Sequence, residues 1–256
     1  MYDPVRDGLD RSVDTVSYRE VDPPSQLDEL VHCYWEMRTE LDQGADVHLH
    51  ALPDACVNVL FDQIDSRIAG VTALHTEHTV LNLGSEFHYV GVQFYPGVWR
   101  GDPEATVDHF VGEPYEGALP LLDTGERLAG IDFAAMEPVL NEFVLGLESD
   151  GVIASNPVTA AILSHIGEIS SVADMARAAN LSTRQLQRTL KATTGFSPHD
   201  LLKVLRLQQS FRQDYRLSFA DQSHFTNSFR RHTGYTPAQF NRTFDIADHD
   251  PAGAVR

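Results

Sequence analysis

One short segment of the sequence groups the side chains best suited to reading DNA bases. Arginine can donate two hydrogen bonds to guanine, glutamine can pair with adenine, and the major groove admits one helix. The candidate residues, which would lie on the outer face of one helix, are Arg184, Gln185, Gln187, Arg188 and Lys191. An ordinary helical hairpin with a solvated, charged face would show the same residues, so spacing alone leaves both interpretations open.

Two short helices would position this face. Residues 171–179 and 182–194 are predicted helices, joined by a tight turn at residues 180–181, and together they have helix-turn-helix form. Ser182 and Gln185 make a capping box at the start of the second helix, and Gly195 ends it. The side chains that would pack the two helices together are Val172, Met175, Ala176, Leu186 and Leu190.

Further helices are predicted around this pair. Residues 133–147 form an amphipathic helix, and residues 146–156 read as a linker. Beyond it, helices are expected over residues 158–166, from the Ser197-Pro198 cap to about 213, over about 221–232, and from Thr236-Pro237 onward.

The first half of the chain is strand-like. Residues 1–27 are polar and irregular, whereas residues 47–52, 56–61 and 88–94 alternate or are rich in β-branched residues. Short strands separated by glycine, proline and aspartate suggest a small β-barrel or sandwich.

Histidines raise the question of a metal. His48 and His50 share one strand face, and His88 could face them across a barrel, where neutral imidazoles could bind zinc or iron. A strand of alternating polar residues explains the pattern without a metal, and we predict no metal site, no cofactor and no catalytic residue. Cys33 and Cys56 are too few for a disulfide framework and are interpreted as small buried residues.

Charge divides the 256 residues into two parts. The net charge of −18, taken alone, argues against binding to nucleic acid. However, residues 1–154 carry 7 basic and 29 acidic residues (7 − 29 = −22), whereas residues 155–256 carry 12 basic and 8 acidic residues (12 − 8 = +4). Such asymmetry suggests an acidic domain joined to a phosphate-facing one. No membrane span and no secretory signal are expected, which predicts a cytoplasmic protein.

Two longer stretches resemble AraC-type transcription regulators. The first runs from Val172 through Leu181-Ser182-Thr183-Arg184-Gln185-Leu186-Gln187-Arg188 and Gly195-Phe196-Ser197-Pro198 to Arg206-Leu207, and the second from Ala220 through Phe229-Arg230-Arg231 and Thr233-Gly234-Tyr235-Thr236-Pro237 to Phe240. The resemblance implies two recognition helices about one DNA turn apart. The positions it adds, on the second helix, are Gln222, Ser223, Thr226, Asn227 and Arg230.

The chain departs from the family pattern between the two helix-turn-helix modules. Only 12 residues, 207–218, stand where the family has roughly twice as many, including the first helix of the second module. This shortening leaves open whether the second module still reads DNA.

The first half resembles a sensor domain found in some of these regulators. Pro23-Pro24, residues 30–35, residues 52–61 and residues 91–97 carry the likeness, with Ala55 where a glycine is usual and Gln93 where a basic residue is usual. The resemblance implies a cupin-like barrel that binds a small molecule or forms a dimer contact.

The expected fold class is therefore α+β with two domains. A β-rich, cupin-like sensor or dimerisation domain covers residues 1–150, an all-α DNA-binding domain with a shortened second module covers 157–243, and an acidic flexible tail covers 244–256. We predict a regulator that binds promoter DNA and responds to an unknown small-molecule effector, with a homodimer and RNA polymerase as candidate partners, and not an enzyme. The alternatives are a metal-dependent cupin enzyme using His48, His50 and His88, or a regulator that has lost autonomous DNA binding and acts through a protein partner.

Overall fold

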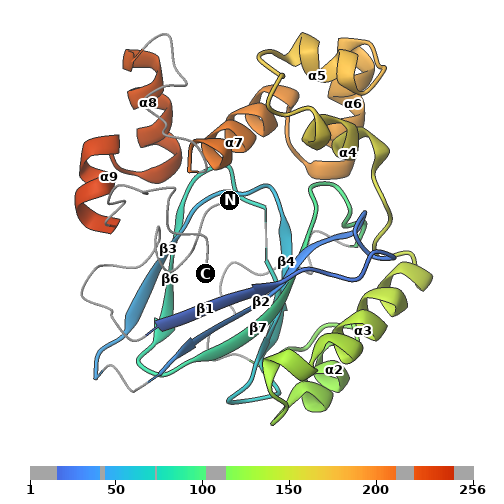
Figure 1. Cartoon of the computed structure of the whole chain (residues 1–256), viewed down its shortest axis with the longest axis vertical. Helices are drawn as coiled ribbons and strands as arrows, with labels where there is room; N and C mark the ends of the chain where they lie inside the picture. Colours follow the sequence, from blue (N-terminus) through green and yellow to red (C-terminus); the bar gives the residue numbers. More distant parts are fainter. Residues whose placement is uncertain (1–15, 41–43, 73, 102–113, 212–221, 245–256) are drawn as a thin grey trace, which may run out of the picture.

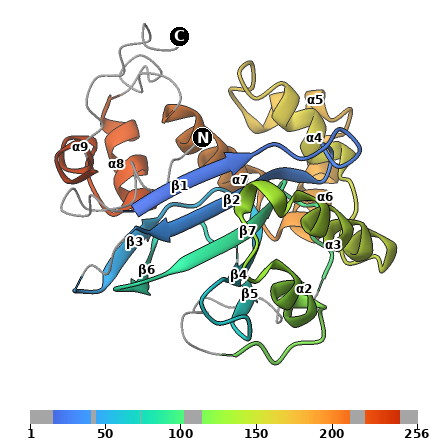
Figure 2. The ribbon, with the colours of Figure 1, turned by 60° about the horizontal axis from the view of Figure 1, so that its bottom comes forward.

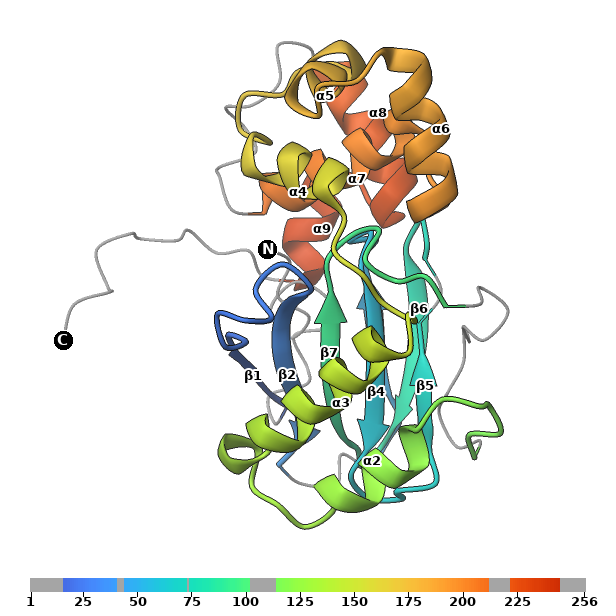
Figure 3. The ribbon, with the colours of Figure 1, turned by 90° about the vertical axis from the view of Figure 1, so that its right-hand side faces the viewer.

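The structure is a computed structural model that describes residues 16–40, 44–72, 74–101, 114–211 and 222–244. Over these ranges a β-rich N-terminal part is followed by a helical C-terminal part, and Figure 3 shows the later helices stacked over one end of the strands. The predicted α+β fold class is confirmed, whereas the likeness to a cupin barrel stays a prediction.

The strands form two antiparallel sheets. Their bounds are β1 Val16–Val21, β2 Val31–Thr39, β3 Val47–Ala51, β4 Val57–Asp62, β5 Ala69–Val71, β6 Thr79–Gly84 and β7 His88–Phe94. Five strands have the order β1-β2-β7-β4-β5, and β3 pairs with β6 in a separate two-stranded sheet. The three predicted strands are thereby confirmed as β3, β4 and β7.

The larger sheet is buried on both faces. On β4, Val59 and Phe61 point into a core closed by the helices α2, Leu121–Leu128, and α3, Glu137–Ser149, which cross that face in Figure 3. Leu60 points the other way, into a core that it shares with Leu49 and Leu83 of the small sheet. This alternation follows from the two-residue period of a strand.

One expectation for the first half is wrong and another is shifted. Residues 16–21, expected to be irregular, form the edge strand β1, because β2 supplies its hydrogen-bond partners from Val16 opposite Thr39 to Val21 opposite Tyr34. The linker predicted over residues 146–156 begins later than expected: α3 runs to Ser149, and residues 150–156 connect it to the next helix, with Ile153 bridged to Trp99.

The three histidines considered for a metal do not come together. His48 is exposed on β3, and His50 on the same strand is buried against the helical part. His88 lies on the other sheet, with its Nε2 atom 2.9 Å from Glu36 Oε1. Glu36, only 2% exposed, also accepts hydrogen bonds from Arg19 and thereby ties β1, β2 and β7 together. Over the described ranges, we find no cluster of three side chains that could ligate a metal.

The helices of the C-terminal part begin and end close to the predicted positions. Their bounds are α4 Pro157–Ser164, α5 Val172–Ala178, α6 Thr183–Thr194, α7 Pro198–Ser210, α8 Gln222–Thr233 and α9 Pro237–Phe244. In Figure 1, α7 lies between the α4–α6 group and the α8–α9 pair. Within the described ranges, none of the helices has the length and apolar character needed to cross a membrane.

The packing of Trp35 on β7 makes Gly91 intolerant of a side chain. A Cβ atom at Gly91 would lie 2.3 Å from the Trp35 ring, which is fixed by a 3.1 Å hydrogen bond from Nε1 to Asn58 Oδ1. Gly91→Ala should therefore lower the free energy of unfolding by about 1–3 kcal/mol, measured by urea denaturation. The matched control is Gly146→Ala in α3, where nothing lies within 4 Å and a gain of about 0.5–1 kcal/mol is expected. Equal stability of the two variants would contradict this account.

Candidate nucleic-acid interface

The helix pair α5–α6 is defined by its capping residues. The Ser171 side chain accepts from the Asp174 backbone N–H and begins α5. At the start of α6, Ser182 Oγ accepts from the Gln185 backbone N–H, and Gln185 Oε1 accepts from the Ser182 backbone N–H at 3.0 Å. Gly195, at a left-handed φ of +73°, ends α6. The predicted capping box and both ends of the predicted helix over residues 182–194 are confirmed.

Buried apolar side chains fix the orientation of the pair. Met175 of α5 and Leu186 and Leu190 of α6 are each 0% exposed. They pack with side chains from α4 and α7, and the cluster includes Ile162, Ile169, Ala176, Phe196, Leu201, Leu202, Val204 and Leu205. Because Leu186 and Leu190 face inward, the opposite face of α6 is turned to solvent.

The outward face of α6 carries the five predicted residues, and they fall into two groups. Arg184, Gln187 and Arg188 are exposed, and within the described part of the chain their side chains make no hydrogen bond or ion pair. Gln185 is committed to the capping box, and Lys191 Nζ donates to the Gly195 carbonyl at 2.6 Å. The first three are therefore the side chains most free to contact a ligand.

The second predicted group lies on α8. Asn227 and Arg230 are exposed and Thr226 is half-buried. Gln222 and Ser223 occupy the first turn of α8, but their side chains lie outside the described residues. Both α6 and α8 pack on α7, which separates them in Figure 1.

The core of the second module includes a side chain from the β-rich part. The shortened segment 207–218 is described only up to residue 211, with α7 ending at Ser210. In this core Leu52, which follows β3, is 6% exposed and clusters with Leu207, Phe229, Phe240 and Phe244. The β-rich part therefore supplies packing to α8 and α9 in addition to that supplied by α7.

Hydrogen bonds hold the end of α8 against the β3–β6 sheet. His50 Nε2 donates to the Thr233 carbonyl at 2.6 Å, and the His78 backbone N–H donates to the His232 carbonyl at 2.9 Å. His232 Nδ1 lies 2.6 Å from the Thr76 carbonyl. Burial lowers the pKa of His50, and the His78 ring, 4.5 Å away between centroids, lowers it too. His50 therefore serves as a neutral donor in this contact.

Residues 52–56, here called the docking loop, touch both helical modules. Leu52 enters the second module's core, and Ala55 enters that of the first. Between them, the Pro53 carbonyl accepts from Gln208 Nε2 of α7 at 2.8 Å. Ala55 has a left-handed φ of +62°, which is the conformation that glycine adopts most easily and agrees with the glycine usual at this position.

Asp54 of the docking loop is a half-buried carboxylate whose hydrogen bonds within the described part of the chain come from neutral groups. Its Oδ1 accepts from the Cys56 backbone N–H at 2.8 Å, and its Oδ2 accepts from Gln93 Nε2 at 2.9 Å. Burial raises the pKa of Asp54 to about 6. Neither Asp54 nor the docking loop was predicted as a functional element from sequence; the unusual Ala55 and Gln93 were the only signals there.

Comparison with known proteins adds three findings. Residues 19–110 match a family described as a domain of unknown function (DUF6597). The HTH-type transcriptional regulator RipA of Corynebacterium diphtheriae is 29% identical over 110 residues, which cover 38% of this chain and 33% of that protein. The chain resembles an HTH-type transcriptional regulator. This likeness confirms the resemblance predicted from the motifs, over about a third of the relative's length.

Two solved structures are similar at low scores. ToxT from Vibrio cholerae has a TM-score of 0.39 and 10% identity, covering 89% of this chain and 98% of its own. The AraC-like transcriptional activator CuxR has a TM-score of 0.21 and 15% identity, covering 77% and 87%. These TM-scores are too low to support an argument, and the fold described above stands on the chain's own structure.

The docking of Leu52 predicts that a change in the β-rich part weakens the second module. Leu52→Ala should lower the free energy of unfolding by about 2–4 kcal/mol, because it leaves a cavity among buried phenylalanines. Hydrogen exchange should quicken in α8 and α9 more than in α5 and α6. Ile64→Ala, at a side chain 59% exposed, is the control and should change stability by less than about 0.5 kcal/mol. Unchanged exchange in α8 would disprove the contact.

The pKa of Asp54 predicts a pH-dependent stability. Its folded pKa of about 6 lies above the ordinary 3.8, so the folded state holds this proton longer and stability falls as pH rises from about 4 to 6. Asp54→Asn removes this penalty. The variant's free energy of unfolding relative to the unmodified chain should therefore rise by up to about 3 kcal/mol across that range. Denaturant titrations at several pH values measure it, and a pH-independent difference would refute the assignment.

Proposed function

We propose that this chain is a DNA-binding transcription regulator that uses α6 as a recognition helix. The observation that carries the proposal is the face of α6, where Arg184, Gln187 and Arg188 are exposed while Leu186 and Leu190 anchor the helix. The helix fits the width of a major groove, and its side chains match the donors that read guanine and adenine. The likeness to an HTH-type regulator supports the same function.

The charge distribution supports contact with phosphate from the helical part. Residues 155–256 have a net charge of +4, whereas residues 1–154 carry −22. Contacts from arginine to phosphate would supply affinity, and base contacts from residues 182–191 would supply sequence choice. The acidic part would keep its own surface away from the duplex.

On this proposal the second module contributes a further contact through α8. Asn227 and Arg230 are exposed, while the end of α8 is held by Thr233 and His232 against the β-rich part. The docking therefore leaves the Asn227 and Arg230 side chains accessible. Gln222, Ser223 and Thr226 remain predicted base-facing positions.

The proposal also assigns a separate role to each segment of the chain. Residues 1–150 would sense an effector or dimerise, residues 157–243 would bind DNA, and residues 244–256 would be a tail. Promoter DNA, a second copy of the chain, RNA polymerase and a small molecule are the partners proposed, with a cytoplasmic location. A regulator of this kind needs no catalytic residue.

Fluorescence anisotropy with the chain's own upstream promoter duplex tests the proposal. The promoter should bind more tightly than a scrambled duplex of equal length, and binding should weaken as salt rises, because counterions are released from the phosphates. Equal affinity for both duplexes at each salt concentration would contradict sequence-specific recognition.

Arg188→Ala should cost about 1–3 kcal/mol of binding free energy on the promoter duplex and much less on the scrambled one, if Arg188 reads a base. The matched control is Arg127→Ala in α2, where Arg127 pairs with Glu142 on the β-rich part. Its loss should leave duplex binding unchanged. An equal loss on both duplexes for Arg188→Ala would assign Arg188 to phosphate and overturn its role in base reading.

A second candidate function is a regulator that needs a protein partner for its DNA contact. The observation that favours it is the reliance of the second module's core on Leu52 rather than on the helices of that module alone. Salt-dependent binding of the purified chain to duplex DNA would exclude this alternative.

A further inference from the structure

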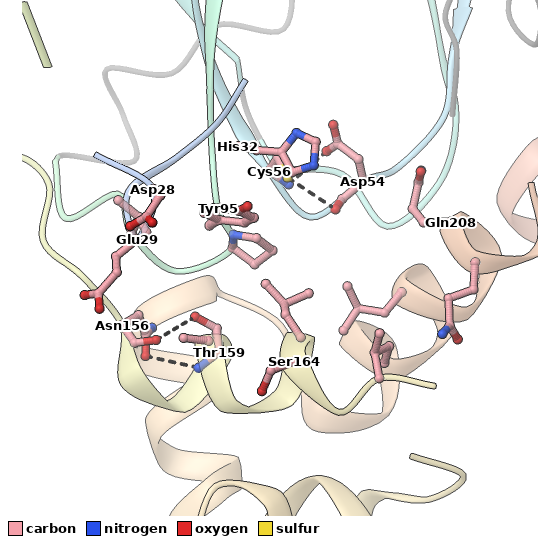
Figure 4. Close-up of a pocket in the computed structure, with 17 residues that line it drawn as sticks. Asp28, Glu29, His32, Asp54, Cys56, Tyr95, Asn156, Thr159, Ser164 and Gln208 are labelled. Carbon is pink, nitrogen blue, oxygen red and sulfur yellow. Dashed lines mark hydrogen bonds between the residues drawn. The ribbon is translucent and has the colours of Figure 1, made fainter. Parts of the chain in front are cut away.

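A pocket of about 450 Å³ lies between the β-rich part and the helices. Figure 4 shows Asp54, Cys56 and Tyr95 on one side, and Thr159 and Ser164 of α4 on the other. Leu205 and Gln208 of α7 line it as well. Its volume is within the range of pockets that hold small organic molecules.

The polar lining of the pocket is acidic. Asp28 and Glu29, in the turn before β2, lie at one side of the pocket, and Asp54 lies beside Cys56. Among the described residues that line the pocket, none is lysine or arginine. An anionic ligand would therefore meet three carboxylates and His32 but no lysine or arginine, whereas a cation would meet complementary charge.

Apolar side chains from both parts of the chain also line the pocket. Pro96 and Val98 follow β7, Leu163 belongs to α4, and Leu205 belongs to α7. The Tyr95 ring also faces the pocket and packs edge-on against His32, with ring centroids 5.3 Å apart. Such walls suit the carbon skeleton of a ligand, not a hydrated metal ion.

Over the residues that the structure describes, the groups that donate hydrogen bonds to Asp54 carry no formal charge. Gln93 Nε2 and the Cys56 backbone N–H both donate to it, and neither carries a formal charge. A half-buried carboxylate with these donors loses part of its hydration without gaining an ion pair. A ligand ammonium group would supply the missing charge.

We propose that this interdomain pocket binds a small organic cation, an amine on an apolar skeleton, and that this cation is the effector of the regulator. Asp54 would pair with the ammonium group, and the apolar walls from Val98, Leu163 and Leu205 would enclose the skeleton. The effector role rests on the proposed function, whereas the binding site does not.

The position of Asp54 in the docking loop indicates how ligand binding would affect the arrangement of the two helical modules. On either side of it in the docking loop, Leu52 packs into the second module and Ala55 into the first. The pocket also includes Gln208, whose side chain holds the docking loop to α7. A ligand here would bias the arrangement of both modules to the extent that it binds one arrangement more tightly than another.

Isothermal titration calorimetry of the full chain without DNA tests the site. The probes are two matched series: tryptamine with indole-3-ethanol and indole-3-propionate, and phenethylamine with 2-phenylethanol and 3-phenylpropionate. At least one amine should bind, and at least about tenfold more tightly than its alcohol and its acid, because only the amine pairs with the carboxylate. Failure of both amines to bind, or equal binding of the alcohol or acid, would overturn the proposal.

Two variants locate the site. Asp54→Asn should abolish the preference for the amine, and Ala160→Trp, at an exposed alanine that lines the pocket, should abolish binding. Their controls are Asp123→Asn and Ala134→Trp, both at exposed residues outside the lining, and both should bind as the unmodified chain does. Thermal unfolding of each variant checks that it folds. A folded Ala160→Trp variant that still binds the amine would place the site elsewhere and overturn the proposal.

Promoter binding separates the two proposals. Saturation with the amine found by calorimetry should change the affinity for the promoter duplex in the unmodified chain but not in Asp54→Asn. Selective amine binding with unchanged duplex affinity would overturn the effector role. If no duplex binds with or without the amine, the proposed regulator function fails while the calorimetric result for the pocket stands.

Discussion

The packing of the docking loop, residues 52–56, is the contact on which the helical part depends. Leu52 and Ala55 are 6% and 2% exposed, and each belongs to the core of a different helical module. The Pro53 carbonyl is bonded to Gln208, on the α7 helix that both modules share. One short segment of the β-rich part thus fixes α7 and packs the elements on both sides of it, which makes the two parts mechanically dependent.

The helices were predictable because their signals are local. Ser182, Gln185 and Gly195 determine where α6 begins and ends, and the spacing of Leu186 and Leu190 determines its buried face. The exposed face of Arg184, Gln187 and Arg188 follows from the same periodicity. Strand β1 and helix α2 were not predicted, because their stability comes from β2 and from the buried sheet face, which a local pattern does not reveal.

The interface between the β-rich and helical parts could not be predicted from the sequence, because its contacts join residues that are far apart in the chain. His50 contacts Thr233 across 183 residues, and its imidazole was considered as a metal ligand because His48 is near it in sequence. Alternation placed His50 and His48 on one strand but did not say that a helix end covers one of them. The environment of Asp54 also becomes visible only in the fold, where the neutral side chain of Gln93 on β7 donates a hydrogen bond to its carboxylate.

The docking has a consequence for how a regulator of this architecture could respond to a signal. Two recognition helices engage successive turns of DNA only when their separation matches the duplex, about 34–36 Å. On the proposed function, this spacing would be set by α7, against which α6 and α8 both pack, and by the docking loop that is bonded to it. A small displacement of the loop would act on both modules at once, because their cores are close-packed and do not deform continuously. On the proposed function, a ligand beside Asp54 would need to favour one loop position by only a modest free energy to change duplex affinity, since that affinity would depend on the alignment of both helices together.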